Sequence, residues 1–216
     1  MLRSRRTRIF LESQMLPLQQ PSRSSAVVSI AGEAEVDQAI ATLVVAFGTD
    51  PVARWMYADP LEYSKHIPRL FQALGTSSFE AGAALRTCDG LGAALWLPPG
   101  VYSDDRELGA VVAESIARAR QAEVIAVFER TEHYRPTEPH WYLSLIGVKD
   151  AFRNKGYGAA LLQHGLGQCD RDHRPAYLWS SNRRNTSLYE RHGFEIVDTI
   201  QVGSSPSIFP MVRHPR

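Results

Sequence analysis

The 216-residue sequence lacks an apolar run long enough to cross a membrane. Apolar stretches such as "AIATLVVAF" at 39–47 end well before the ~20 residues that a transmembrane helix needs. Cysteine is also scarce, and Cys88 and Cys169 form no disulfide framework, so we expect two buried thiols in a reducing compartment. These features predict a cytoplasmic protein with no membrane partner.

Several ligand motifs are missing too. No Gly-Lys pair occurs, which argues against a P-loop, and Leu161 stands where a dinucleotide-binding fingerprint would need Gly or Ala. The histidines His66, His133 and His192 show no metal-ligand spacing, so we predict no metal.

A net positive charge is missing from most of the chain. The net charge is +1, but residues 1–25 carry five arginines against one acid, Glu12, which leaves −3 for residues 26–216. A body of that charge lacks the basic footprint of a nucleic-acid-binding protein, so we predict no nucleic-acid partner. Residues 1–25 lack hydrophobic periodicity and predict a disordered basic tail, with an organelle transit peptide as the alternative. Residues 26–216 are expected to form one domain.

Strands and helices alternate along that domain. A strand at 26–31 precedes a helical pattern, and a second helical stretch is ended by Gly75 or interrupted at Pro68. The turn residues Asp89 and Gly90 predict a hairpin between strands in 79–87 and 90–98, and a helix is expected from 104 to about 130.

The last third predicts a strand at 140–148, a helix at about 156–171, a strand at 176–181, a helix at about 184–192 and further strands. A strand, a crossover helix and a strand in this order predict a parallel pair.

The segment "FRNKGYGAALL" at 152–162 lies where the first strand of that pair meets its helix. A helix that starts there points unpaired N–H groups and its positive dipole end outward, and glycines let a phosphate approach the backbone. A solvated basic turn is the alternative interpretation. Gly147, inside the strand, predicts a bulge or a close backbone approach, and the freed groups of Ile146 and Val148 could pair with a pantetheine arm. Coenzyme A fits both features.

These residues carry a family resemblance. Arg153, Gly156 and Gly158 match the signature pattern of the GNAT superfamily of N-acetyltransferases, and Asn182, Tyr189, Gly193 and Phe194 match a second superfamily element. Over about 27–215 the chain most resembles puromycin N-acetyltransferase-like proteins, through "EPHWYLSLIGV", "PAYLWSSNRRNTSLYERHGF" and "GAALWLPPG".

The resemblance implies an α/β fold (α+β by some schemes) with a mixed central sheet of about six or seven strands, flanked by helices, and a splayed parallel pair. It implies acetyl-CoA as co-substrate. The residues expected to bind it are Ile146, Gly147, Val148, Arg153, Asn154, Lys155, Gly156, Tyr157, Gly158, Ala159 and either Asn182 or Asn185.

The chemistry of acyl transfer needs further groups. A main-chain N–H of 146–148 could stabilise the oxyanion, and the resemblance makes Tyr189 the general acid for the departing thiolate, although a core aromatic is the alternative. No acid or histidine stands in "WYLSLIGV", so the candidate bases are Glu138, His140 or a water held by Ser144. Loss of the proton to water, with the amine arriving partly neutral, is the alternative.

We also expect Trp55, Met56 and Tyr57 in a loop that lines the acceptor pocket, although they could equally form a helix corner. The resulting hypothesis is direct transfer of acetyl from acetyl-CoA to a primary amine of a small molecule, in a ternary complex, by a monomer or homodimer. The alternatives are a non-catalytic acyl-CoA sensor, an acetyltransferase that acts on a protein amine, and nucleic-acid binding through the tail.

Overall fold

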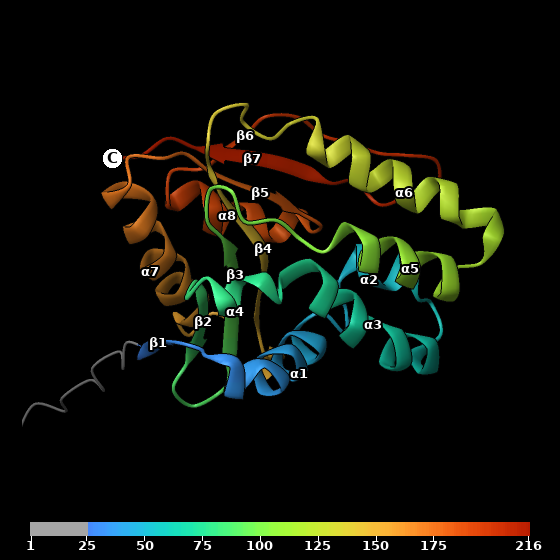
Figure 1. The fold of residues 1–216 in the computed structure, drawn as a ribbon, viewed down its shortest axis with the longest axis horizontal. Helices are drawn as coiled ribbons and strands as arrows, with labels where there is room; N and C mark the ends of the chain where they lie inside the picture. The colour runs from blue at the N-terminus through green and yellow to red at the C-terminus, as the bar shows by residue number, and fades with distance from the viewer. Residues whose placement is uncertain (1–25) are drawn as a thin grey trace, which may run out of the picture.

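The computed structural model describes residues 26–216, so the disordered tail predicted for residues 1–25 lies outside the described residues. A seven-stranded mixed sheet in the order β1-β2-β3-β4-β5-β7-β6 forms its centre (Figure 1). The strands are β1 Val28–Ile30, β2 Ala84–Thr87, β3 Gly92–Leu97, β4 Trp141–Val148, β5 Ala176–Ser180, β6 Glu195–Ile196 and β7 Phe209–Arg213. This confirms the predicted fold class.

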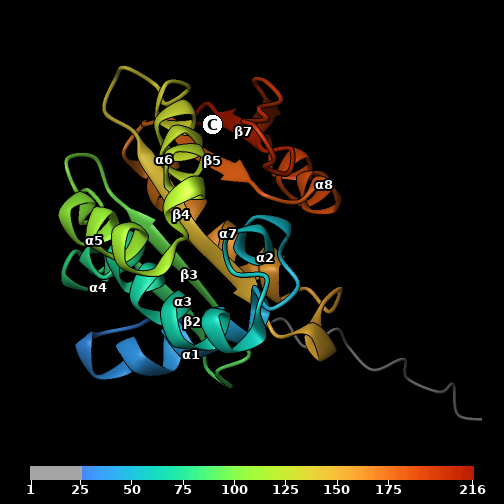
Figure 2. The ribbon, with the colours of Figure 1, turned by 90° about the vertical axis from the view of Figure 1, so that its right-hand side faces the viewer.

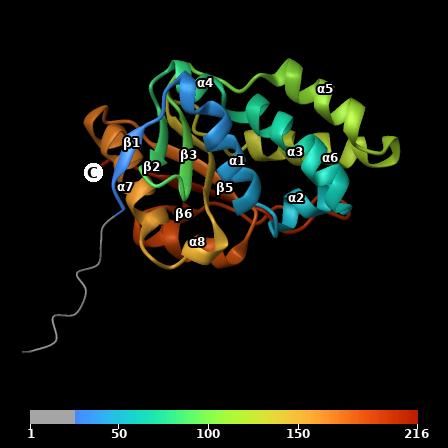
Figure 3. The same cartoon turned by 90° about the horizontal axis from the view of Figure 1, so that it is seen from below.

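Helices cover both faces of the sheet. They are α1 Val36–Ala46, α2 Pro51–Met56, α3 Pro60–Gly75, α4 Ser77–Glu80, α5 Asp105–Ser115, α6 Arg118–Glu132, α7 Tyr157–Arg171 and α8 Arg183–Arg191, with short 3₁₀ turns at Glu33–Glu35 and Asp150–Phe152. Beside β2 and β3, α7 lies on one side, and α1, α3 and α5 lie on the other (Figure 1 and Figure 3). One hydrophobic core therefore lies on each face.

Two aspartates start consecutive helices in the same way. Asp50 caps α2 and accepts hydrogen bonds from the backbone N–H groups of the second and third helical residues, and Asp59 does the same for α3. Each cap is followed by a proline at the first helical position, where its missing N–H costs nothing. The sequence "DP" thus begins both helices.

The central pair of strands is parallel, as predicted. Only two residue pairs join β4 to β5, Trp141 with Ala176 and Tyr142 with Tyr177, and the strands then diverge toward their carboxyl ends (Figure 2). On its other side β4 stays paired with β3 as far as Val148, with a bulge opposite the step from Leu95 to Trp96. The sheet therefore opens on one side of β4 only.

Several predicted elements differ in detail. Pro68 lies inside α3 without ending it, and the start of the strand predicted at 79–87 is the end of α4. The helix predicted over 104–130 is two helices, because Ile116 has an extended backbone between α5 and α6. The hairpin prediction is confirmed, with Gly90 at φ +67° and β2 antiparallel to β3.

The thiols differ from the prediction as well. Cys169 is buried in α7, but Cys88 is exposed in the hairpin turn. Within residues 26–216, none of the helices is long and apolar enough to span a membrane.

Candidate active site

A cavity of about 1050 Å³ opens where β4 and β5 diverge. Leu70 and Phe71, which belong to the core between the sheet and α3, line one part of it. Leu188 and Tyr189, which belong to or pack against the core beneath α7 and α8, line another part. The cavity therefore connects the two faces of the sheet, and we call it the cleft.

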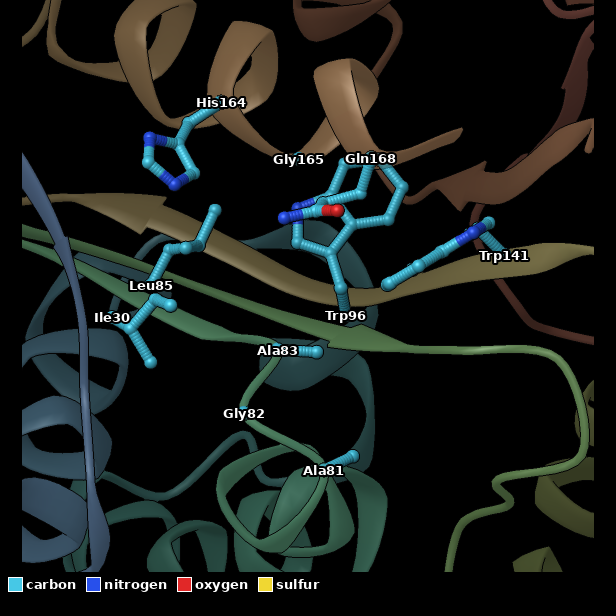
Figure 4. Close-up of a pocket in the computed structure, with 10 residues that line it drawn as sticks. All are labelled: Ile30, Ala81, Gly82, Ala83, Leu85, Trp96, Trp141, His164, Gly165 and Gln168. Carbon is cyan, nitrogen blue, oxygen red and sulfur yellow. The ribbon is translucent and has the colours of Figure 1, made fainter. Parts of the chain in front are cut away.

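A second pocket, of about 160 Å³, lies between α7 and the strands β1 to β4 (Figure 4). The indole Nε1 of Trp96 is buried there with no hydrogen-bond partner among the described residues, and an added Cβ at Gly165 would lie 2.2 Å from it. This pocket has no acidic residue in its lining and is far smaller than the ~300–1000 Å³ of most ligand sites. The cleft is thus the better candidate for a nucleotide cofactor.

The amino-terminal end of α7 faces the cleft without a side-chain cap. Its N-cap residue is Gly156, at φ +91°, and the first helical hydrogen bond runs from Ala160 N–H to Gly156 C=O. The N–H groups of Tyr157, Gly158 and Ala159 have no partner in the described residues. Asn154 also has positive φ, at 61°, and such alternating backbone makes an anion-binding concavity.

The predicted cations have structural partners of their own. Arg153 donates to the carbonyl of Ala46 at 2.8 Å, at the end of α1, and forms a 2.8 Å ion pair with Asp150. The Lys155 ammonium lies 4.8 Å from the centre of the Phe152 ring. Both residues still line the cleft, so their charge adds to that of the helix end.

Tyr157 anchors the start of α7. Its hydroxyl donates to the carboxylate of Asp89 at 2.9 Å, which ties the helix to the β2–β3 turn. This hydrogen bond raises the pKa of Tyr157.

The edge of β4 supplies unpaired backbone. The N–H of Lys149 donates to the C=O of Leu91, just before β3, and because strand residues alternate in direction, the N–H groups of Ile146 and Val148 face the open side. That side has no strand neighbour among the described residues, since pairing with β5 ends at Tyr142. This matches the freed groups expected from the sequence.

Of the two alternatives predicted for Gly147, the structure shows a close approach and not a bulge. An added Cβ there would lie 2.7 Å from the Cβ of Ala46 and 3.2 Å from Cδ2 of Leu43, so the close approach is by α1. The bulge of β4 falls at Ser144 instead, because Leu145 pairs with Leu95 and Leu143 pairs with Trp96. Gly147 thus lets α1 pack directly on the strand.

Both predicted asparagines line the cleft. Asn182 is the N-cap of α8, and its side-chain oxygen accepts a 3.0 Å hydrogen bond from the N–H of Arg184. The side-chain oxygen of Asn182 is therefore already used to cap α8. Asn185 has an exposed side chain with no such role in the described residues.

Tyr189 lies in the cleft and is 6% exposed. Its ring packs edge-on against Phe194, with ring centres 6.1 Å apart, and its hydroxyl has no hydrogen-bond partner among the described residues. Burial, together with the negative charge of Asp50, raises the pKa of this hydroxyl far above its usual value. Tyr189 therefore keeps its proton at neutral pH.

Sequence reasoning missed Asp50. One of its carboxylate oxygens accepts 3.0 Å hydrogen bonds from the N–H groups of Val52 and Ala53, and the other accepts from the hydroxyl of Ser181, just after β5. Burial raises the pKa of Asp50, although these hydrogen bonds and Arg153 act against it. Asp50 is the only acidic residue that lines the cleft in the part of the chain that the structure describes.

The predicted bases do not reach the cleft. Glu138 is exposed in the loop before β4, and its carbonyl lies 2.9 Å from Nδ1 of His140. Both residues precede the amino end of β4, whereas the cleft begins at Leu143 on that strand. Ser144 does line it, but its hydroxyl donates to Leu74 C=O at 2.8 Å.

The predicted acceptor residues are also placed differently. Trp55 and Met56 belong to α2 and not to a loop, and of the three residues only Met56 lines the cleft. Trp55 donates to the Ser204 hydroxyl and stacks under Arg120, while the Tyr57 hydroxyl pairs with Ser115 at 2.7 Å. Trp55 and Tyr57 thus hold α2 against α5, α6 and the loop before β7.

Comparisons with known proteins agree with this geometry. Residues 102–196 match the family model of the acetyltransferase (GNAT) domain. An uncharacterized N-acetyltransferase of Schizosaccharomyces pombe is 26% identical over 197 residues, which cover 82% of this chain and 79% of the relative.

Solved structures share the fold. A protein of Corynebacterium glutamicum described as histone acetyltransferase HPA2 and related acetyltransferase is 26% identical, with a TM-score of 0.65 over 89% of this chain and 97% of that one. Arylalkylamine N-acetyltransferase 2 of Aedes aegypti, at 13% identity, has a TM-score of 0.61 over 88% of this chain and 99% of its own. An agmatine N-acetyltransferase, at 15% identity, has a TM-score of 0.60 over 88% and 99%.

The fold, the domain match and the two relatives at 26% identity together support the assignment of this chain to the GNAT superfamily of acetyltransferases. They identify the chain as an acyltransferase enzyme, as the sequence predicted. The finer resemblance to puromycin N-acetyltransferase stays a prediction.

Proposed function

We propose that this enzyme transfers an acetyl group from acetyl-CoA to a primary amine of a small molecule, by direct attack in a ternary complex. One observation carries the proposal: a single cleft joins an uncapped helix end to a buried tyrosine and a half-buried carboxylate. The first feature suits a donor pyrophosphate, and the other two suit the proton transfers of acyl transfer.

The donor half of the cleft fits coenzyme A. The free N–H groups at the start of α7 would bind the pyrophosphate, with Arg153 and Lys155 adding positive charge. The backbone of Ile146 and Val148 would pair with the amides of the pantetheine arm as an extra strand. Asn185 has the more available amide, because Asn182 caps α8.

The reaction needs one bond to form and one to break. The amine nitrogen attacks the thioester carbonyl, its lone pair forms the new C–N bond, and the C–S bond then breaks so that its electron pair leaves with sulfur. The charge on the carbonyl oxygen would be met by a free N–H of Ile146 or Val148. These groups are fixed by the β3–β4 pairing before the substrate arrives.

Three protons must move when the amine binds as an ammonium: nitrogen loses one before it attacks and one, to solvent, after the C–N bond forms, and sulfur gains one. The ammonium proton would pass to Asp50, directly or through Ser181, because a carboxylate with a raised pKa is better matched to a proton acceptor's task near neutral pH. Tyr189 would donate its proton, or a strong hydrogen bond, to the departing sulfur. The raised pKa of Tyr189 keeps its hydroxyl protonated, but it also makes complete transfer of the proton to sulfur less favourable.

Thiol release from acetyl-CoA tests the proposal. Wild-type protein with a panel of primary amines should release free coenzyme A, and Tyr189→Phe should lower kcat by about 10²-fold with little change in acetyl-CoA affinity. Tyr57→Phe is the matched control, since it removes a buried tyrosine hydroxyl outside the cleft. No turnover with any amine, while acetyl-CoA still raises the melting temperature, would instead support a non-catalytic sensor.

A further inference from the structure

The acceptor half of the cleft is apolar. It is formed by one face of α3 together with side chains of α2, α6 and β5, and we call it the acceptor lobe: Met56, Ile67, Leu70, Phe71, Leu74, Phe128 and Trp179. Ile67, Leu70, Phe71 and Leu74 recur at the spacing that places them on one helix face, and each is at most 8% exposed. The lobe thus has an apolar wall that is already packed.

Charge is divided unevenly along the cleft. The cationic lining residues are Arg153, Lys155, Arg184 and Arg191, and all of them belong to the signature loop or to α8, on the donor side. The acidic lining of the described residues is Asp50 alone, where α2 starts. A cationic amine can therefore pair with the carboxylate of Asp50, beside the reaction centre. The described residues that line the acceptor lobe offer it no second carboxylate.

Aromatic side chains give the lobe its shape. Phe128 and Trp179 meet edge to face with ring centres 6.4 Å apart, and Phe71 packs against Phe47 in the same way at 5.1 Å. The indole N–H of Trp179 is already donated to the hydroxyl of Tyr142 at 3.0 Å. What these side chains offer a ligand is ring surface, which favours an alkyl or aromatic body.

We infer that the acceptor is a small monoamine with an apolar body, whose ammonium lies at Asp50 and whose body fills the acceptor lobe. This inference rests on the proposed function. A diamine of the same length would bury its second ammonium against Leu70 and Phe71 with no counter-charge, and an unpaired charge in an apolar site is costly. The cleft should therefore favour amines whose end opposite the reacting nitrogen is uncharged.

The matched substrates hexylamine and hexane-1,6-diamine test this directly. With wild-type protein and saturating acetyl-CoA, thiol release should give a kcat/KM about 100-fold higher for hexylamine. Equal or faster turnover of the diamine would overturn the inference and leave the proposed function standing. A lysine-containing peptide that outperforms hexylamine would contradict both the inference and the small-molecule acceptor of the proposed function. If no amine releases thiol while acetyl-CoA raises the melting temperature, both proposals fail.

A designed second carboxylate provides an independent test. Met56 ends α2 six positions after Asp50, or about 9 Å along the helix axis, which is a span that the extended diamine can bridge. Met56→Glu should narrow the hexylamine preference at least tenfold, whereas Leu61→Glu, at an exposed position of α3 outside the cleft, should not change the ratio. A folded Met56→Glu protein with an unchanged ratio would contradict the inference. If this variant does not fold, the wild-type comparison decides alone.

Discussion

The hydroxyl of Ser181 donates a hydrogen bond to the carboxylate of Asp50, 131 positions earlier in the chain. Ser181 directly follows β5, and Asp50 starts α2 on the α3 face of the sheet, so this hydrogen bond bridges the opening between β4 and β5. The raised pKa of Tyr189 also has a contribution from Asp50. The proposed acid and the proposed base are therefore electrostatically coupled within one cleft.

Asp50→Asn should lower kcat/KM by about 10² to 10³-fold, because it removes the proton acceptor. The acid limb of the wild-type pH profile should lie above the usual aspartate range, since burial raises the pKa of Asp50, and this limb should disappear in the variant. Steady-state rates between pH 4 and 9 provide the measurement.

The capping role of Asp50 needs its own control. Asparagine is as good an N-cap as aspartate, so α2 should persist in the variant. Asp59→Asn makes the same change at the equivalent cap of α3, where the side chain does not line the cleft, and should leave activity unchanged. Comparable losses in both variants would mean that helix capping, and not proton transfer, explains the effect.

Gly158→Glu should abolish acetyl-CoA binding, because it adds a negative charge to the helix end that faces the donor phosphates. The fold should tolerate the change, since an added Cβ would meet only Leu188 at 3.4 Å and Val148 at 3.9 Å, and an acid suits the first turn of a helix. Calorimetric titration with acetyl-CoA is the test. Gly158→Ala should bind nearly as well as the wild type, and an unchanged affinity in Gly158→Glu would refute the phosphate site.

The donor half of the candidate site could be proposed from the sequence because its signals are local. The loop from Arg153 to Gly158 and the strand before it carry glycine spacing, charge and periodicity within a single stretch. Asp50 could not be found in that way. Its proposed role depends on a hydrogen bond to Ser181 across the sheet, and a lone "DP" resembles an ordinary helix start, which it also is.

The sequence prediction of the acceptor residues was wrong for a related reason. Trp55 and Tyr57 form a conspicuous aromatic cluster, yet the turn of α2 points them toward Ser204 and Ser115, and the plainer Met56 faces the cleft. In a short helix, neighbouring residues face different directions, so composition alone cannot tell which one meets a ligand.

Gly147→Ala should destabilise the protein by about 1–3 kcal/mol, because the new methyl group would press against Ala46 at 2.7 Å and Leu43 at 3.2 Å. The sequence showed that a glycine lies within the strand, but it did not show that α1 is the neighbour that requires it. Urea unfolding measures the effect, with Gly109→Ala as the control, since an added Cβ there meets nothing within 4 Å. A stability equal to that of the wild type would show that α1 can move away from β4 without cost.

Asp170 and Arg213 make the fold sensitive to acid. Arg213 of β7, whose side chain is 4% exposed, donates to both carboxylate oxygens of Asp170 on α7, at 2.8 and 2.9 Å. These hydrogen bonds hold the pKa of Asp170 below its usual value. A carboxylate whose pKa is lowered by folding stabilises the protein above its unfolded pKa of about 3.9, and this stabilisation is lost as the pH falls through the folded value.

Asp170→Asn should therefore lower the free energy of unfolding by roughly 1–3 kcal/mol at neutral pH, where a charged hydrogen-bonded pair is broken. The difference from the wild type should shrink below about pH 4, because the wild-type carboxylate then becomes protonated as well. Denaturant unfolding at pH 7, 5 and 3 measures both effects. Asp37→Asn, at an exposed position of α1, should change stability by less than about 0.5 kcal/mol at each pH. A difference for Asp170→Asn that stayed constant from pH 7 to pH 3 would mean that its side chain contributes through packing and not through its charge.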